Sequence, residues 1–149
     1  MPQTLRHGAA RRRAWGTFPT TADMGLWARG RDPAELFEAL GLSLFAAMTD
    51  LRTVRPREER AVDASGTDPV ALAVAYLQAL LALADGDGYL ARSIRVRTLG
   101  DPPTALLAAV RGEPRDPARH PGKVEIKAIT WHAAQVDLAR GRARLIVDI

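Results

Sequence analysis

Two stretches in the first half of the chain have the hydrophobic spacing of helices. The first begins at Asp32-Pro33, an N-cap residue followed by a proline at the first helical position, and Glu35 lies three residues after the cap as in a capping box. Apolar residues then recur at intervals of three and four, which places them on one face of a helix. They are Phe37, Leu40, Gly41, Leu44, Phe45 and Met48. We therefore expect a helix from Pro33 to about Thr49.

The second helical stretch is apolar on nearly every face. Thr67-Asp68-Pro69 repeats the capping signal, residues 70–84 follow, and Asp85-Gly86-Asp87-Gly88 ends the pattern with glycines that permit a left-handed exit. A helix without a polar face belongs in the interior, between layers of structure. The apolar run is shorter than the roughly 20 residues that span a bilayer, so we expect no membrane association.

The second half of the chain changes to alternation with a period of two, which is typical of half-buried strands. Ala139-Arg140-Gly141 lies between the last two alternating segments and is a plausible hairpin turn. The predicted strands are residues 94–98, 106–110, 124–128, 134–138 and 142–147.

Two less regular segments complete the first half. A short strand is expected over Leu26–Arg29, and an irregular hairpin or an edge strand over Leu51–Asp63. Helices first and strands afterwards indicate an α+β fold. We expect a single domain in which two principal helices pack on a largely antiparallel, or mixed, sheet.

Charge is distributed unevenly along the chain. The 149 residues contain 21 Lys and Arg against 17 Asp and Glu, a net charge of +4. Residues 1–16 contain four arginines, no acidic residue and no hydrophobic periodicity. We expect residues 1–16 to be a flexible basic extension and residues 17–149 to be a domain with no net charge.

Composition and motifs exclude several kinds of chemistry. The chain has no cysteine, which excludes disulfides, thiolate zinc sites, iron–sulfur clusters and thiol nucleophiles. It also lacks a phosphate loop, a dinucleotide-binding glycine motif and a His-Glu-x-x-His motif. Asp85-Gly86-Asp87-Gly88 is half of a calcium loop without the later ligands, and we interpret it as a helix-ending turn. Without a signal sequence, we expect a cytoplasmic protein.

Carboxylates occur at both ends of the predicted domain. Asp23 precedes the first strand, and the sequence ends on Asp148 and Ile149, so that the Asp148 side chain neighbours an α-carboxylate. Repulsion between such anions favours a bound cation, and oxygen ligands suit Ca²⁺ or Mg²⁺. The alternative is a solvated terminus.

Two histidines and a lysine are further candidates. His120 lies in an expected loop and is either an acid–base group or a solvated or capping side chain. His132 follows Trp131 at a strand end, where a half-buried, hydrogen-bonded histidine is the alternative to acid–base chemistry. Lys127 is one of two lysines in the chain, and its compact ammonium suits a phosphate or carboxylate unless it is simply solvated.

Five stretches of the sequence, from about Phe18 onward, form a pattern that is specific when taken together. They are Thr21–Gly30 with Glu35–Ala39, Phe45–Asp50, Gly112-Glu113 with Asp116 and His120, Glu125–His132, and Val147–Ile149. In their order and spacing they resemble the archease family, which assists RtcB-type RNA ligases. Two positions depart from the family pattern: Thr20 stands where the family has histidine, and Ala79 where it usually has an acid.

The resemblance implies an activator with no catalytic residue of its own. Such a protein promotes guanylylation and repeated turnover of the ligase in tRNA splicing or RNA repair. The family's metal site maps to Asp23, Asp148 and Ile149, with Ca²⁺ as the first choice over Mg²⁺ or Mn²⁺. Lys127 and His132 are candidate functional contacts beside it. The expected partner is the RtcB-type ligase, and RNA would be reached only indirectly through it.

Two other function classes stay open. One is an RNA-binding module that uses its arginines and has no ligase-activating role. It is less favoured because acids balance Arg95 and Arg97 and because the few aromatic residues form no obvious interleaved pattern with basic ones. The other is a metallohydrolase using Asp23, Asp148 and His132, for which the sequence shows no nucleophile or base arrangement.

Overall fold

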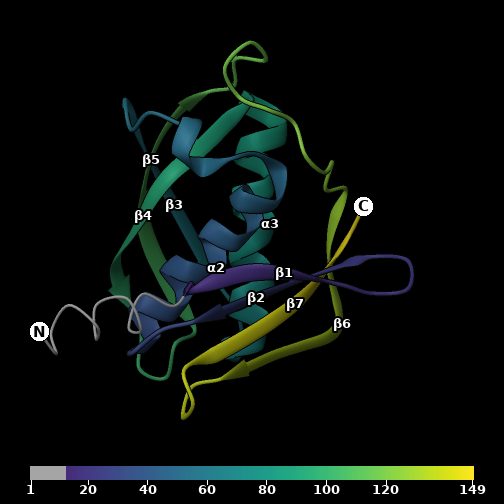
Figure 1. Cartoon of the computed structure of the whole chain (residues 1–149). Helices are drawn as coiled ribbons and strands as arrows, with labels where there is room; N and C mark the ends of the chain where they lie inside the picture. The colour runs from purple at the N-terminus through teal and green to yellow at the C-terminus, as the bar shows by residue number, and fades with distance from the viewer. Residues whose placement is uncertain (1–12) are drawn as a thin grey trace, which may run out of the picture.

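Two antiparallel sheets enclose two helices in the computed structural model, which describes residues 13–149 (Figure 1). The strand orders are β1-β2-β7-β6 and β3-β5-β4. The predicted α+β class is confirmed, but the strands form two sheets instead of one. The helices are α2 (Pro33–Met48) and α3 (Pro69–Asp87), and the strands are β1 (Trp15–Pro19), β2 (Met24–Arg29), β3 (Glu58–Ser65), β4 (Tyr89–Leu99), β5 (Ala105–Pro114), β6 (Ala128–Asp137) and β7 (Arg142–Asp148).

Both helices start as their capping signals predict. The Asp32 carboxylate accepts a hydrogen bond from the Glu35 N–H at 2.8 Å, and the Asp68 carboxylate accepts one from the Ala71 N–H at 2.8 Å. The Glu35 side chain accepts from the N–H of Arg31, one residue before the cap, at 3.1 Å. These bonds satisfy backbone donors that the first turn of a helix leaves free.

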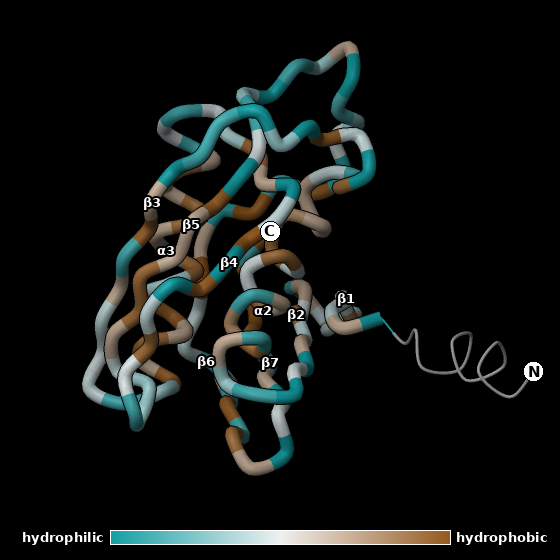
Figure 2. The backbone as a smooth tube through the Cα atoms, turned by 90° about the vertical axis from the view of Figure 1, so that its left-hand side faces the viewer, coloured by the Kyte–Doolittle hydropathy of each residue, from teal (hydrophilic) through white to brown (hydrophobic). Residues whose placement is uncertain are grey.

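Helix α3 is the interior helix that its sequence predicts. The helix is long enough and apolar enough to cross a membrane, so the prediction that its apolar run is too short is wrong. Its apolarity has a structural cause, since the helix packs against strands of both sheets, and Figure 2 shows its hydrophobic stretches inside the fold. The helix ends at Gly88, whose φ of 63° is the predicted left-handed exit.

The segment before β6 is not the strand predicted at residues 124–128. Residues 121–127 have no regular structure, and the strand begins at Ala128. The N–H groups of Lys123 and Val124 instead donate to the carbonyls of Met48 and Ala47, at 3.1 and 3.2 Å. These carbonyls belong to the last turn of α2, where a helix lacks internal donors. The segment therefore caps a helix instead of joining a sheet.

The start of the domain also differs from the prediction. Strand β1 begins at Trp15, before the expected boundary at residue 17, and the Ala14 carbonyl accepts a hydrogen bond from the Arg29 N–H at 2.8 Å. The first residues of β1 show no hydrophobic periodicity of their own, and they form a strand because they pair with β2. The predicted flexibility of the basic extension concerns residues 1–12, which lie outside the described residues. The uncertain segment Leu51–Asp63 forms a short 3-10 helix, Leu51–Thr53, and most of the edge strand β3.

Candidate functional site

The register of the four-stranded sheet brings together the carboxylates from the two ends of the domain. Strands β2 and β7 are antiparallel, with Met24 opposite Val147. Asp23 immediately precedes Met24, and Asp148 immediately follows Val147, so both carboxylates lie at the same end of this strand pair. Figure 1 shows the C-terminal end of β7 beside the start of β6, where Ala128 pairs with Asp148.

Backbone hydrogen bonds hold this end of the sheet in place. The Thr20 hydroxyl accepts the Asp23 N–H at 3.0 Å and so fixes the turn between β1 and β2. The Lys127 N–H donates to the Asp148 carbonyl at 2.7 Å, which places Lys127 next to the carboxylates. Asp23 is half-buried, while the side chains of Asp148, Ile149 and Lys127 are exposed. The arrangement presents anionic groups and one ammonium to solvent.

His132 does not join the carboxylates. The pairing of β6 with β7 breaks off after Thr130 and resumes at Gln135, and His132 lies in the unpaired stretch, where Ala133 has a φ of 54°. The His132 side chain is exposed and forms no hydrogen bond with another residue of the described part. The half-buried, hydrogen-bonded alternative is therefore wrong for this histidine.

A metal at this end of the sheet would depend on oxygen donors. Within residues 13–149, no group of three or more His, Cys, Asp or Glu side chains is close enough to hold an ion. Asp23 and Asp148 supply two side-chain carboxylates, and the carboxylate of Ile149 would be the third anionic donor. Such a set fits hard cations such as Ca²⁺ or Mg²⁺ and leaves coordination positions for other oxygens. The His132-containing trio of a metallohydrolase finds no support in this geometry.

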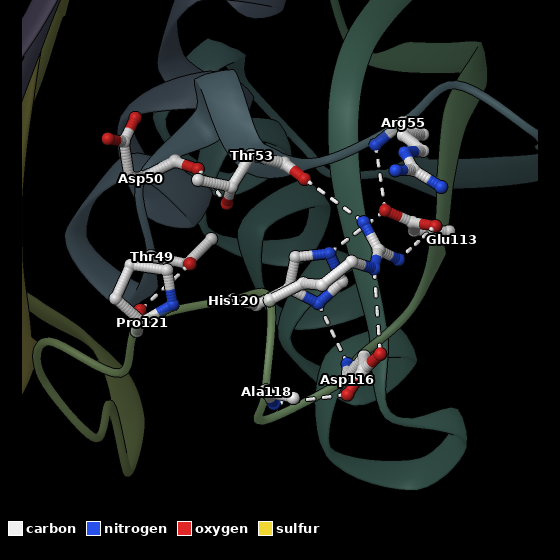
Figure 3. Close-up of polar contacts among 10 residues, drawn as sticks. Thr49, Asp50, Thr53, Arg55, Glu113, Asp116, Ala118, His120 and Pro121 are labelled. Carbon is white, nitrogen blue, oxygen red and sulfur yellow. Dashed lines mark hydrogen bonds and ion pairs between the residues drawn. The ribbon is translucent and has the colours of Figure 1, made fainter.

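A second polar cluster, formed by Glu113, His120, Arg119, Asp116 and the backbone of Arg55, is centred on two buried side chains, Glu113 and His120 (Figure 3). Glu113 is 3% exposed, and His120 is 1% exposed. One carboxylate oxygen accepts the Arg55 N–H at 2.8 Å and faces His120 Nε2 at 2.9 Å. The other accepts from Arg119 Nη2 at 2.7 Å. Every oxygen of this buried carboxylate therefore has a hydrogen-bond donor.

The hydrogen bonds fix the tautomer of His120. Its Nδ1 accepts the Asp116 N–H at 2.8 Å, so the proton of the neutral ring is on Nε2, where it is donated to Glu113. The hydrogen bond from Arg119 lowers the pKa of Glu113 to about 2, with help from the Arg55 N–H and His120 and against the effect of burial. Glu113 is thus an ionised, fully bonded group, and His120 is a structural histidine.

This buried cluster connects three segments. It joins the end of β5 to the loop 115–121 and to the residues that follow α2. The Thr49 hydroxyl reinforces the connection by donating to the Pro121 carbonyl at 2.9 Å. Sequence reasoning left His120 as a loop residue and missed its burial. One sequence signal could have indicated this burial. Glu113, Asp116 and His120 occur together in one of the stretches that carry the family resemblance.

A family model described as the Archease protein family matches residues 15–149. The chain belongs to the archease family. The matched region begins at Trp15, the first residue of β1, and contains both the carboxylate end of the sheet and the buried cluster.

Archease proteins of other organisms are similar over nearly their whole length. Protein archease of Thermococcus gammatolerans is 38% identical over 141 residues, which cover 92% of this chain and 99% of that protein. Protein archease of Methanothermobacter thermautotrophicus is 34% identical over 135 residues, covering 89% and 96%. The solution structure of Methanobacterium thermoautotrophicum protein 1598 has 29% sequence identity and a TM-score of 0.72, covering 93% of this chain and 100% of that one. The fold is thus shared with a solved structure.

Proposed function

We propose that this protein is an accessory protein that activates an RtcB-type RNA ligase in the cytoplasm, during tRNA splicing or RNA repair. It would promote guanylylation of the ligase and so permit repeated turnover, while the ligase carries the histidine that accepts GMP. Membership of the archease family over residues 15–149 is the observation that carries this proposal. The absence of a recognisable nucleophile in the sequence agrees with an activating role.

The proposed site of action is the carboxylate end of the four-stranded sheet. Asp23, Asp148 and the carboxylate of Ile149 would hold a divalent cation, with Ca²⁺ as the first choice and Mg²⁺ or Mn²⁺ as alternatives. When bound, the cation supplies a positive centre with free coordination positions for an oxygen of the ligase or of a nucleotide phosphate. The register that brings both ends of the domain to one place supports this assignment.

Lys127 and His132 are proposed as contacts with the partner. Lys127 follows the segment that caps α2, and its N–H donates to the Asp148 carbonyl, so that this exposed lysine lies next to the proposed cation site in the sheet. A point charge there can approach a phosphate that the cation also contacts. His132 lies further along β6 on exposed backbone and would contact the ligase without touching the cation.

The test is a guanylylation assay with the cognate ligase, in which the GMP–ligase adduct is measured over time with and without this protein. We expect faster charging with the wild-type chain in the absence of RNA, and multiple turnovers in a separate reaction that contains an RNA substrate. Asp23→Asn should abolish the stimulation with little change in melting temperature, because Asp23 lies outside the apolar core. Asp63→Asn is the matched control, since Asp63 is an exposed aspartate on the other sheet. Equal charging with and without the wild-type protein would refute the proposal.

A further inference from the structure

The outer face of the four-stranded sheet carries arginines and aromatic rings on adjacent positions. On β2 and β7 the residues that face the helices are buried, so that their neighbours in sequence point outward. The inward residues are Leu26, Ala28, Ala143, Leu145 and Val147. The outward residues are Trp27 and Arg29 on β2 and Arg142 and Arg144 on β7, and Phe18 on β1 joins them.

Glycines on neighbouring strands seat the two aromatic rings. Trp27 is opposite Gly16, where an added Cβ would come within 2.6 Å of the indole Nε1. Phe18 is opposite Gly25, where an added Cβ would collide with the phenyl ring. Each ring therefore lies across the backbone of a residue without a side chain, a known arrangement of aromatics and glycines in sheets.

Arginines cover the other side of these rings. The Arg29 guanidinium carbon lies 5.0 Å from the centroid of the Trp27 ring, and that of Arg144 lies 4.3 Å from the centroid of Phe18. Both distances are within the range of cation–π interactions. The sheet thus presents guanidinium groups stacked on aromatic rings, and the outward plane of such a guanidinium can stack on a nucleobase.

Three arginines on this face form no ion pair within residues 13–149, although Asp137 is opposite Arg142 in the strand register. Arg29 is directly opposite Arg142 in the strand register, and like charges at opposed positions are destabilising. In the part of the chain that the structure describes, Arg29, Arg142 and Arg144 form no ion pair, in contrast to the arginines at positions 31, 52, 60, 119 and 140. An anion between Arg29 and Arg142 would relieve their repulsion.

The other sheet provides an internal comparison. Its outer face also has arginines, Arg95 and Arg111, but Glu59 pairs with Arg111 in the register and Asp63 lies on the same face. No aromatic ring accompanies them, since the outward positions are occupied by residues such as Leu107 and Ala109. On the four-stranded sheet, Asp137 is likewise opposite Arg142, and Asp148 lies on the same face at the end of β7. In the described residues, the feature confined to one of the two outer faces is therefore the combination of arginines with aromatic rings.

We propose that Phe18, Trp27, Arg29, Arg142 and Arg144 form a surface that binds single-stranded RNA directly. Phosphates bind between Arg29 and Arg142, and bases stack on the guanidinium–ring pairs. Gln135, exposed and opposite Arg144, adds an amide that can reach a base edge or a 2′-hydroxyl. The choice of RNA over DNA rests on the proposed function. Direct binding departs from the expectation that RNA is reached only through the ligase.

The test measures fluorescence anisotropy of an unstructured, fluorescein-labelled RNA of 12 nucleotides with the full chain, in low salt and without ligase. We expect Arg29→Gln with Arg142→Gln to weaken binding about tenfold or more, and rising salt to weaken wild-type binding. The matched control, Arg95→Gln with Arg111→Gln, should bind like the wild type. Arg144→Gln, which leaves the Arg29–Arg142 pair untouched, is a second variant in case the double variant fails to fold.

Further outcomes distinguish binding at this surface from binding by the basic residues near the N-terminus. Trp27→Phe should retain binding but lose most of the RNA-dependent quenching of tryptophan fluorescence. Binding that disappears when arginines 6, 11 and 12 are changed to Gln, and persists in the outer-face variant, would overturn the proposal. Equal affinity for DNA of the same sequence would overturn the assignment to RNA.

An outer-face variant that binds RNA normally but no longer stimulates guanylylation would make the surface a protein interface and refute the proposal. Because guanylylation is measured without RNA and RNA binding without ligase, failure of one proposal is distinguishable from failure of the other.

Discussion

Glu113→Gln tests the interpretation that the buried cluster is an ionised structural network. Glutamine has the same shape but offers one carbonyl oxygen in place of two carboxylate oxygens. If that oxygen keeps the hydrogen bonds from the Arg55 N–H and His120, the new NH₂ group faces the Arg119 guanidinium. Both groups are hydrogen-bond donors, so no hydrogen bond can form between them. The variant then loses one charge-assisted hydrogen bond in a buried place, which costs about 2 to 3 kcal/mol.

The expected loss can be measured by thermal unfolding. For a chain of this size each kcal/mol shifts the melting temperature by roughly 3 to 4 °C, so we expect a decrease of about 10 °C at pH 7. Glu59→Gln, an exposed glutamate on β3, is the control and should shift it by less than about 2 °C.

The pH dependence provides a second check. The folded-state pKa of Glu113 is about 2, below its ordinary value of 4.5. Its contribution to the free energy of unfolding is therefore complete above pH 4.5 and is lost as the pH falls toward 2. Glutamine does not titrate, so the difference between wild type and variant should shrink over this interval. A variant that melts like the wild type at pH 7, or a difference that is the same at pH 3, would refute the reasoning.

Three further predictions concern the chain ends and the interior helix. Extending the chain beyond Ile149 removes its free carboxylate and should weaken Ca²⁺ binding in calorimetry without changing the melting temperature, whereas unchanged affinity would exclude Ile149 from the site. Asp68→Ala removes the N-cap of α3 and should cost about 1 kcal/mol in chemical unfolding, and no loss would contradict the capping role. Deleting residues 1–12 should leave Ca²⁺ affinity intact, while deletion through residue 16 should lower the melting temperature because it removes Trp15 and Gly16 from β1. Equal stability of the two truncations would argue against that role of β1.

Local chemistry made the helices predictable. An aspartate followed by a proline precedes each helix. The aspartate side chain caps an N–H group of the first turn, and the proline restricts φ at the first helical position. Both effects involve only residues within four positions of each other in the sequence. Gly88 and Gly141 likewise mark a helix end and a hairpin turn, where both adopt the positive φ that favours glycine. The resemblance also pointed to Asp23 and Asp148, and the antiparallel pairing of β2 with β7 places these two residues at the same end of the sheet.

The segment around Val124 shows where local patterns fail. Alternation of apolar and polar residues indicates that every second side chain is buried, but it does not indicate which groups the backbone N–H and C=O form hydrogen bonds with. Here the donors meet the free carbonyls of α2, and no strand forms. His120 is a similar case, because its hydrogen-bond partners, Asp116 and Glu113, are brought to it by the path of a loop.

The sequence by itself determined the helices, their ends, the turns, the α+β class and the family to which the chain belongs. Only the tertiary structure decided which strands share a sheet, in which register, and which side chains meet on its faces. The arginine and aromatic surface is the clearest example, since Phe18, Trp27 and Arg144 come from three strands and have no pattern in common along the chain. The physical reason is that capping and turn formation depend on neighbours in sequence, whereas the pairing of β2 with β7 joins residues more than a hundred positions apart.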